Sequence, residues 1–354
     1  MLFKISQYFE MAQSGETRWL PMEGMRGIAV TLVFFVHYSS GMEVKFGARP
    51  GYLDAIHAIG NAGVDIFFVL SGFLIYRAVI RRQINYWKYA SRRVERIYPT
   101  FIFILCVYLG LSIMIPAKSK LPEFGVASYV VANALLLPGM FDIIPIISVA
   151  WSLSYEAFYY IMVPVLVAAI ALRRWTPLYR ICLFSVFLLA YVLWAWSGYA
   201  LHFRLTMFLG GILLYEVSCV WREARESPVI DGLALLLFVA ALGLFAVASG
   251  LANYVFLNFT LVLLLYRCLF ASGPAARLFT FRPMRWLGNM SYSYYLTHSL
   301  GLHAFFLVLS FLEIGNSFVT YTTLIPVAFA FSVMSSIPVY LLVERPLSLK
   351  PAPV

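Results

Sequence analysis

Long apolar stretches, most of them near the length that crosses a bilayer, follow one another along the chain from residue 27 onward. A hydrocarbon core of about 30 Å takes roughly 20 helical residues, because each residue rises about 1.5 Å. The pattern therefore predicts an all-α, polytopic transmembrane helix bundle of about ten spans. The predicted spans are residues 27–41, 59–80, 97–116, 149–171, 179–197, 201–220, 229–249, 252–271, 289–312 and 319–343.

The segment between the third and fourth predicted spans does not fit a further span. Pro116, Pro122, Pro138 and Pro145 interrupt it, and Pro both removes a backbone donor and clashes with the preceding helical turn. We therefore expect its apolar sequence, VASYVVANALLLPG, to form a short re-entrant or interfacial helix.

Composition supports the membrane class. Of 354 residues, 62% are hydrophobic and 12% are charged, and the mean hydropathy is +0.85, which lies outside the range of soluble domains. We find no internal repeat, no low-complexity tract and no cleavable signal peptide. Residues 1–354 are thus expected to form a single membrane-embedded domain without an appended soluble domain.

The basic residues predict the orientation of the bundle, since cationic loops are retained on the cytoplasmic side. If the N-terminal segment and every second loop face inward, 21 of the 26 Lys and Arg residues lie inside. Both termini are then cytoplasmic. Topology and attraction to anionic lipid account for the net charge of +10, so it does not indicate a nucleic-acid partner.

Small residues within the spans are expected to serve packing. Cys106, Cys182, Cys219 and Cys268 lie in apolar runs without the spacing of metal ligands, so no metal site is predicted. The glycines of GNAGVDIFFVLSGF follow no strand and precede no GKS or GKT sequence. They predict close helix contacts rather than a phosphate loop.

Arg26 and His37, with ten residues between them, lie in the first predicted span. Eleven helical steps place the imidazole about 16 Å above the guanidinium, near the middle of the bilayer. An ionisable side chain at that depth is costly and is by default a candidate functional residue.

Three further ionisable residues fall between the midplane of the bilayer and its outer third. Asp65, Glu156 and His298 lie about 9, 10 and 14 Å from their nearer surfaces, and Tyr295 precedes His298 by three residues. Such a set predicts a shared polar cavity, although a residue of this kind alone more often holds helices together by hydrogen bonds. A contact between His37 and Asp65 would suit general-base catalysis, because a carboxylate orients the imidazole.

A cluster of arginines precedes the third span. Arg92, Arg93 and Arg96 lie within about one helical turn, and Arg92 and Arg96, at i and i+4, share a face. Their guanidinium groups suit phosphate oxygens, such as those of the nucleotide end of coenzyme A. The alternative is an anchor for anionic lipid at the inner surface.

Taken together, these segments resemble acyltransferase family 3, the integral-membrane bacterial O-acyltransferases that modify surface polysaccharides and related glycans. The resemblance follows the chain in order through RWLPMEGMRGIAVTLVFFVH, GVDIFFVLSGFLI, RRVERIYP, WSLSYEAFYY, RLTMFLGGILL, LGNMSYSYYLTHSL and VERP. The family's Arg–ten residues–His signature falls on Arg26 and His37. Its arginine motif falls on Arg92, Arg93 and Arg96, and its acidic position falls on Glu156.

The resemblance implies an acyl-CoA donor, with acetyl-CoA expected, and a hydroxyl acceptor on a cell-surface glycan or a lipid-linked sugar in the bacterial inner membrane. The arginines would hold the donor phosphates, while His37 would deprotonate the acceptor or carry the acyl group transiently. Asp65 or Glu156 would orient His37, and Tyr295 and His298 are expected to contact substrate. The family usually has Asp at the position where this chain has Glu23.

Two expectations remain beside this one. The run SYEAFYY stands where the family more commonly has Glu-Gln-Phe-Tyr, so the acceptor is expected to be unusual. Many relatives carry an extra soluble domain after the last span, so this membrane domain is expected to act alone or with a partner.

The alternative function is a proton-coupled transporter or flippase, in which the intramembrane His, Asp and Glu residues relay protons or bind solute.

Overall fold

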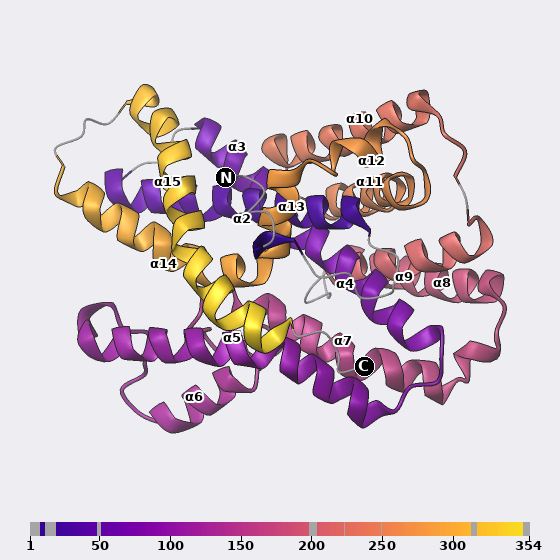
Figure 1. Cartoon of the computed structure of the whole chain (residues 1–354), viewed down its shortest axis with the longest axis horizontal. Coiled ribbons are helices and arrows are strands. Elements are labelled where there is room, and N and C mark those ends of the chain that lie inside the picture. Colours follow the sequence, from indigo (N-terminus) through magenta and orange to yellow (C-terminus); the bar gives the residue numbers. More distant parts are fainter. Residues whose placement is uncertain are drawn as a thin grey trace. The chain divides into compact units, whose positions relative to one another are not determined.

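The helices of the computed structural model follow the predicted apolar runs (Figure 1). The structure describes residues 8–10, 19–47, 51–197, 204–222, 224–248, 250–312 and 317–349. Within these ranges the regular structure is helical, apart from one isolated bridge between Pro138 and Phe141. The predicted all-α class is confirmed.

One compact unit comprises residues 1–83 and 163–291. Its helices are α2 (Leu20–Phe46), α3 (Gly51–Gly60), α4 (Ala62–Ile80), α8 (Pro177–Trp196), α9 (Leu205–Val220), α10 (Pro228–Val247), α11 (Leu251–Phe270), α12 (Pro274–Leu278) and α13 (Arg282–Asn289). Helix α4 packs mainly on α9 and also on α2, while α2 packs mainly on α13 (Figure 1).

Glycines set the closest of these contacts. A Cβ added at Gly60 or Gly63 would collide with α2, and one added at Gly72 would collide with the Phe208 carbonyl oxygen on α9. Gly211 of α9 approaches α4 in the same way. The prediction that Gly60 of α3 and Gly63 and Gly72 of α4 serve helix packing is confirmed, because only a residue without a side chain lets two backbones approach so closely.

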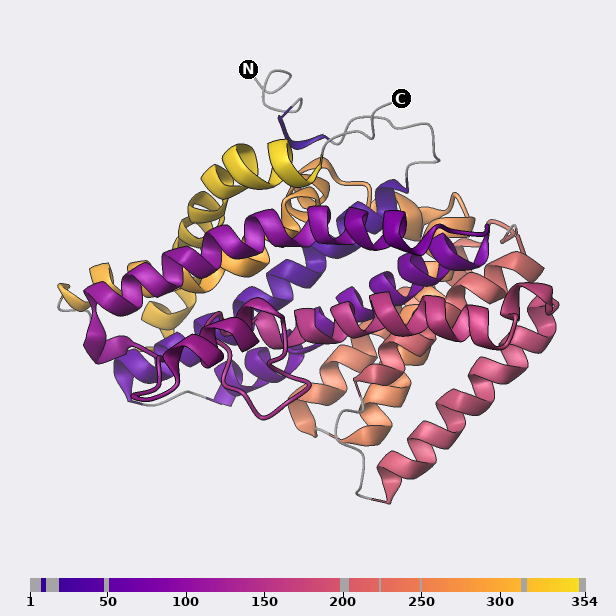
Figure 2. The same cartoon turned by 90° about the horizontal axis from the view of Figure 1, so that it is seen from below.

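The second unit comprises residues 84–162 and 292–354. It contains α5 (Tyr86–Met114), α6 (Val126–Ala134), α15 (Phe318–Val339) and the π-helical segment Tyr340–Ser348. Helices α7 (Ala150–Ala169) and α14 (Ser291–Ser310) belong to it up to residue 162 and from residue 292, respectively. Helix α5 continues through Pro99 as one uninterrupted helix (Figure 2), and its contacts include the π-helical segment.

The predicted spans correspond to helices of unequal length and polarity. In the described part of the chain, eight helices are long and apolar enough to cross a membrane. The run predicted at 201–220 becomes α9, which has 16 residues, and the run at 289–312 becomes the more polar α14. The nine-residue α6 confirms a short helix after the third span. The cytoplasmic orientation of the termini stays a prediction, and residues 1–7 and 350–354 lie outside the described ranges.

Candidate functional site

Helix α2 carries both members of the Arg–ten residues–His signature. It runs without a break from Leu20 to Phe46, so the eleven steps from Arg26 to His37 turn about 1100°, within roughly 20° of three full turns. Both side chains therefore lie on one face of α2, and both are half-buried. The backbone geometry assumed for this pair is confirmed.

Asp65 lies on α4 and is fully buried, but its ion-pair partner is Arg204. The guanidinium Nε lies 3.8 Å from Asp65 Oδ1, and Arg204 Nη2 donates to Asn61 Oδ1 at 3.3 Å and to the Tyr254 hydroxyl at 3.2 Å. These groups gather where α4, α9 and α11 begin.

The expected contact between Asp65 and His37 is corrected by this geometry. Neither carboxylate oxygen of Asp65 accepts a hydrogen bond from any residue in the described ranges. The reason lies in the register of α4: Gly63 faces α2, and Asp65 lies about 200° around the helix from Gly63. The carboxylate therefore points away from α2.

A second histidine lies beside the His37 end of α2. His57 Nδ1 lies 3.1 Å from the Ser39 hydroxyl and 3.4 Å from the Ser40 hydroxyl, and it ties α3 to α2. The sequence analysis treated residues 42–58 as a connecting loop and missed this contact. Helix α3 has only ten residues, so its apolar pattern is too short to distinguish it from a loop.

In the second unit, the arginine cluster of α5 divides into one exposed and two enclosed side chains. The Arg93 guanidinium lies 4.9 Å from the centre of the Tyr160 ring and 5.2 Å from that of Tyr89. Arg96 lies 5.5 Å from the Tyr292 ring centre, whereas Arg92 is exposed. The pair at i and i+3, rather than the predicted pair at i and i+4, thus shares the enclosed face.

Glu156 joins the same cluster through Tyr160. The Tyr160 hydroxyl donates a hydrogen bond to Glu156 Oε1 from one turn further along α7, while its ring lies against Arg93. The structure therefore brings together the arginine motif and the acidic position that the sequence analysis selected separately.

Glu344 completes this cluster, and the sequence analysis assigned it no role. It is fully buried on the π-helical segment, where its Oε1 accepts from Arg96 Nη1 at 2.8 Å. Its Oε2 accepts from the Ser293 amide at 2.9 Å and the Ser293 hydroxyl at 2.5 Å. Both oxygens are engaged, so Glu344 acts by orienting Arg96. An acidic residue at the end of an apolar run was the available signal, and π-helical turns are frequent at functional sites.

The predicted substrate contacts Tyr295 and His298 lie together on α14. The Tyr295 hydroxyl is 2.7 Å from the Ser152 hydroxyl of α7, and the two ring centres of Tyr295 and His298 are 6.1 Å apart. His298 is buried, with Nδ1 3.0 Å from the Tyr294 carbonyl oxygen and its ring stacked on Tyr294. Their role as substrate contacts stays a prediction.

The site residues thus form two sets, one in each unit. The first unit holds Arg26 and His37 on one face of α2, with Asp65 paired to Arg204. The second holds the cluster of Arg93, Arg96, Glu156, Tyr160, Tyr292 and Glu344, which we call the arginine–tyrosine cluster. Its two oriented guanidinium groups suit the phosphates of a ligand, while its two carboxylates accept hydrogen bonds from Arg96 and Tyr160.

Comparison with known proteins gives a consistent result. The sequence model for the acyltransferase domain of acyltransferase family 3 matches residues 20–341. The O-acetyltransferase OatA of Staphylococcus aureus is 23% identical over an alignment of 318 residues, which covers 79% of this chain and 50% of the relative. "Protein 2 in picA locus" of Rhizobium radiobacter is 30% identical over an alignment of 165 residues, which covers 41% of this chain and 81% of that protein. The chain spans about half the length of OatA. No solved structure matches with significance.

Proposed function

Because this chain belongs to acyltransferase family 3, we propose that it is a multi-pass membrane O-acyltransferase of the bacterial inner membrane. Its donor is acyl-CoA, with acetyl-CoA the first to test, and its acceptor is a hydroxyl of a cell-surface glycan or a lipid-linked sugar. The observation that carries the proposal is the arginine–tyrosine cluster, in which the motif arginines and the motif acid are held together.

The donor phosphates bind to Arg93 and Arg96 in this proposal. Tyrosine rings and Glu344 hold the two guanidinium groups in place before the ligand arrives, so less side-chain entropy is lost on binding. Arg92 is exposed and contributes long-range attraction, and Arg26 binds the donor from α2.

His37 is the proposed catalytic residue, with two routes open to it. As a general base, it takes the proton of the acceptor hydroxyl while the hydroxyl oxygen attacks the thioester carbonyl, the C–S bond breaks and the coenzyme A thiolate leaves. As a nucleophile, its imidazole nitrogen displaces the thiolate first, and the acceptor hydroxyl then takes the acyl group. In this proposal Glu156 positions the Tyr160 ring against Arg93. Asp65 positions Arg204 through their ion pair.

The two routes differ in what accumulates without an acceptor. If His37 carries the acyl group, mixing the purified protein with radiolabelled acetyl-CoA alone leaves a labelled acyl-histidine, which peptide mass spectrometry locates. Direct transfer leaves no label on the protein.

The function itself is tested in cells. A strain that lacks this protein is complemented with the wild type or with His37→Ala, and the mass and ester content of its surface glycans are compared. We expect the wild type to add one acyl mass per modified sugar and His37→Ala to add none while inserting normally. Near-normal acylation by His37→Ala would overturn the assignment. Solute transport into vesicles without any acyl donor would favour the transporter alternative.

A further inference from the structure

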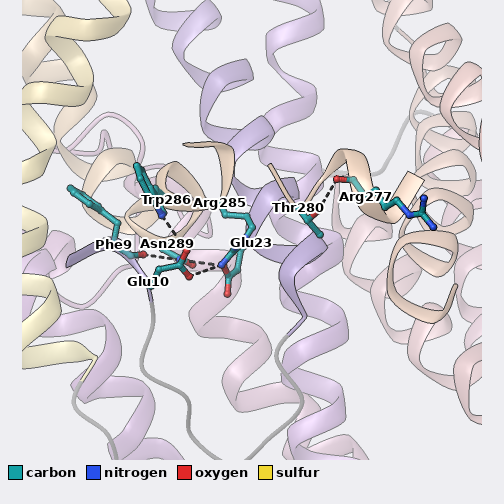
Figure 3. A network of polar contacts seen from close by, with 8 residues as sticks. All are labelled: Phe9, Glu10, Glu23, Arg277, Thr280, Arg285, Trp286 and Asn289. Atoms are coloured by element: carbon teal, nitrogen blue, oxygen red, sulfur yellow. Dashed lines mark hydrogen bonds and ion pairs between the residues drawn. The ribbon is translucent and has the colours of Figure 1, made fainter. Parts of the chain in front are cut away.

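A buried polar network holds the start of α2, where Arg26 lies (Figure 3). Its residues have no role in the reaction proposed above. Arg285 of α13 donates from Nε to Glu23 Oε2 at 3.0 Å and from Nη2 to Glu10 Oε2 at 2.5 Å. Asn289, one turn further along α13, donates to the same Glu23 oxygen at 3.2 Å. One guanidinium thus bridges a carboxylate of α2 and a carboxylate of the N-terminal segment.

The N-terminal segment docks on α13 through three further contacts (Figure 3). The Phe9 carbonyl oxygen accepts from Asn289 Nδ2 at 2.9 Å, and Glu10 Oε1 accepts from Trp286 Nε1 at 3.2 Å. The Phe9 and Trp286 rings lie 6.1 Å apart. The Glu10 side chain is 25% exposed, whereas the side chains of Arg285 and Glu23 are 7% and 8% exposed. Glu10 is therefore the network's solvent-side member.

The backbones of α2 and α13 are interlocked at the same place. A Cβ added at Gly24, Gly27 or Gly288 would collide with a backbone oxygen of the opposing segment. Arg26 lies between the first two of these glycines. Since packed elements of this kind move together rather than deform, a displacement of α13 must also displace the backbone that carries Arg26.

We infer that Glu10 and Arg285 are positioning residues for Arg26, and that the docked segment Tyr8–Glu10 is a strap that holds the donor-binding end of α2 in place. The strap closes the network by giving Arg285 its second carboxylate. With the strap undocked, one end of a buried guanidinium loses its partner, and such groups relax towards water or other acceptors. The inference rests on the proposed function, because it assumes that Arg26 binds the donor.

The first test is Glu10→Gln in the full-length protein, reconstituted in lipid nanodiscs. This change keeps the size of the side chain and removes its charge, so it weakens a charge-assisted hydrogen bond at a position that is 25% exposed. We expect the KM for acetyl-CoA to rise about three- to tenfold. The kcat and the KM for the acceptor should stay close to those of the wild type.

Glu43→Gln is the matched control, because it makes the same charge change at an exposed position near the far end of α2. It should leave all three parameters unchanged. An unchanged KM for acetyl-CoA in Glu10→Gln would overturn the inference. So would a variant in which only kcat falls, in proportion to the amount of protein that is no longer folded.

Donor binding must stabilise the strap to the same degree that the strap favours donor binding, because coupling between sites is reciprocal. Acetyl-CoA should therefore slow hydrogen exchange of the amides of residues 20–28 and of α13 in the wild type, and slow it less in Glu10→Gln. Arg285→Lys keeps the charge but cannot bridge two carboxylates with one planar guanidinium. Its protection by acetyl-CoA should therefore be reduced, as in Glu10→Gln. Equal protection in the wild type and both variants would contradict the strap.

The two proposals fail differently. If the wild type neither binds nor consumes acetyl-CoA, the donor assignment fails and the role of the strap in donor binding fails with it. If the wild type uses acetyl-CoA and Glu10→Gln uses it with the same KM, only the strap is wrong.

Discussion

Single residues that look equivalent in the sequence differ in their surroundings. Three arginines lie within one turn at the start of α5, yet only Arg93 and Arg96 contact aromatic rings, while Arg92 points to solvent. A guanidinium that is already oriented binds a phosphate with little further loss of entropy, whereas an exposed one is screened by salt and must be ordered first.

This difference predicts unequal effects on donor affinity. Arg93→Gln should raise the dissociation constant for acetyl-CoA about 10- to 100-fold, the range expected when a charge-assisted hydrogen bond is lost. Arg92→Gln is the matched control and should change it by less than about threefold at physiological salt. Isothermal titration of the purified variants measures both. Equal losses in the two variants would assign the arginines to general attraction of anions instead.

At the scale of elements, the sequence predicts the long helices well because bilayer thickness imposes their length. It predicts the short helices α3, α12 and α13 poorly, because bilayer thickness does not constrain their length. Helix α13 also has the polar sequence RPMRWLGN, which shows no apolar run. The same limit applies to the site. Spacing predicted that His37 lies about 16 Å further along one helix than Arg26, but it could not tell which face of α4 carries Asp65 towards Arg204.

The π-helical segment shows why Glu344 escaped prediction. Regular 3.6-residue periodicity fails where a helix widens, so a pattern of apolar positions gives no direction for a side chain there. Only the folded chain brings Glu344 to Arg96, 248 residues away. The contact fixes α5 to the segment that follows α15.

That contact predicts a non-additive effect on stability. Glu344→Leu alone leaves the Arg96 guanidinium, whose side chain is 30% exposed, without its buried partner and should cost about 1–3 kcal/mol, whereas replacing both members of such a pair by apolar residues is often neutral. The double variant Arg96→Leu with Glu344→Leu should therefore unfold at a higher temperature than Glu344→Leu. The double-mutant cycle compares the unfolding temperatures of the wild type, the two single variants and the double variant. They are measured in detergent, without ligand, by intrinsic tryptophan fluorescence. Additive losses would show that the pair is not coupled.

Contacts between α4 and α9 predict a second effect on stability. Gly72→Ala places a methyl group against the Phe208 backbone, and such overpacking costs about 1–3 kcal/mol. Gly110→Ala on α5 is the matched control, because its added Cβ meets no atom within 4 Å. The unfolding temperature should fall for the first variant and not for the second. A similar temperature for both would show that α4 and α9 separate at little cost.

At the scale of the whole molecule, the number of membrane crossings decides on which side each loop lies. Eight described helices are long and apolar enough to cross, while α9 has 16 residues and spans about 24 Å against a core of about 30 Å. Helix α14 has 20 residues, but most of its polar residues lie in its first half. The predicted distribution of Lys and Arg, with 21 of 26 assigned inward, favours crossing by both of these helices.

Alkaline phosphatase, which is active only outside the cytoplasm, tests this assignment when it is fused at successive loops. If α9 crosses, a fusion after Arg225 is inactive, because the chain has returned to the basic, cytoplasmic side; if α9 turns back, the same fusion is active. If α14 crosses, a fusion after Leu312 is active. A fusion after Glu123 should be active in either case and serves as the control for export, while green fluorescent protein at the C-terminus should fluoresce. An active fusion after Arg225 would reverse every loop between α9 and α14, and the basic residues of that region would then lie outside, against the charge rule that predicts the topology.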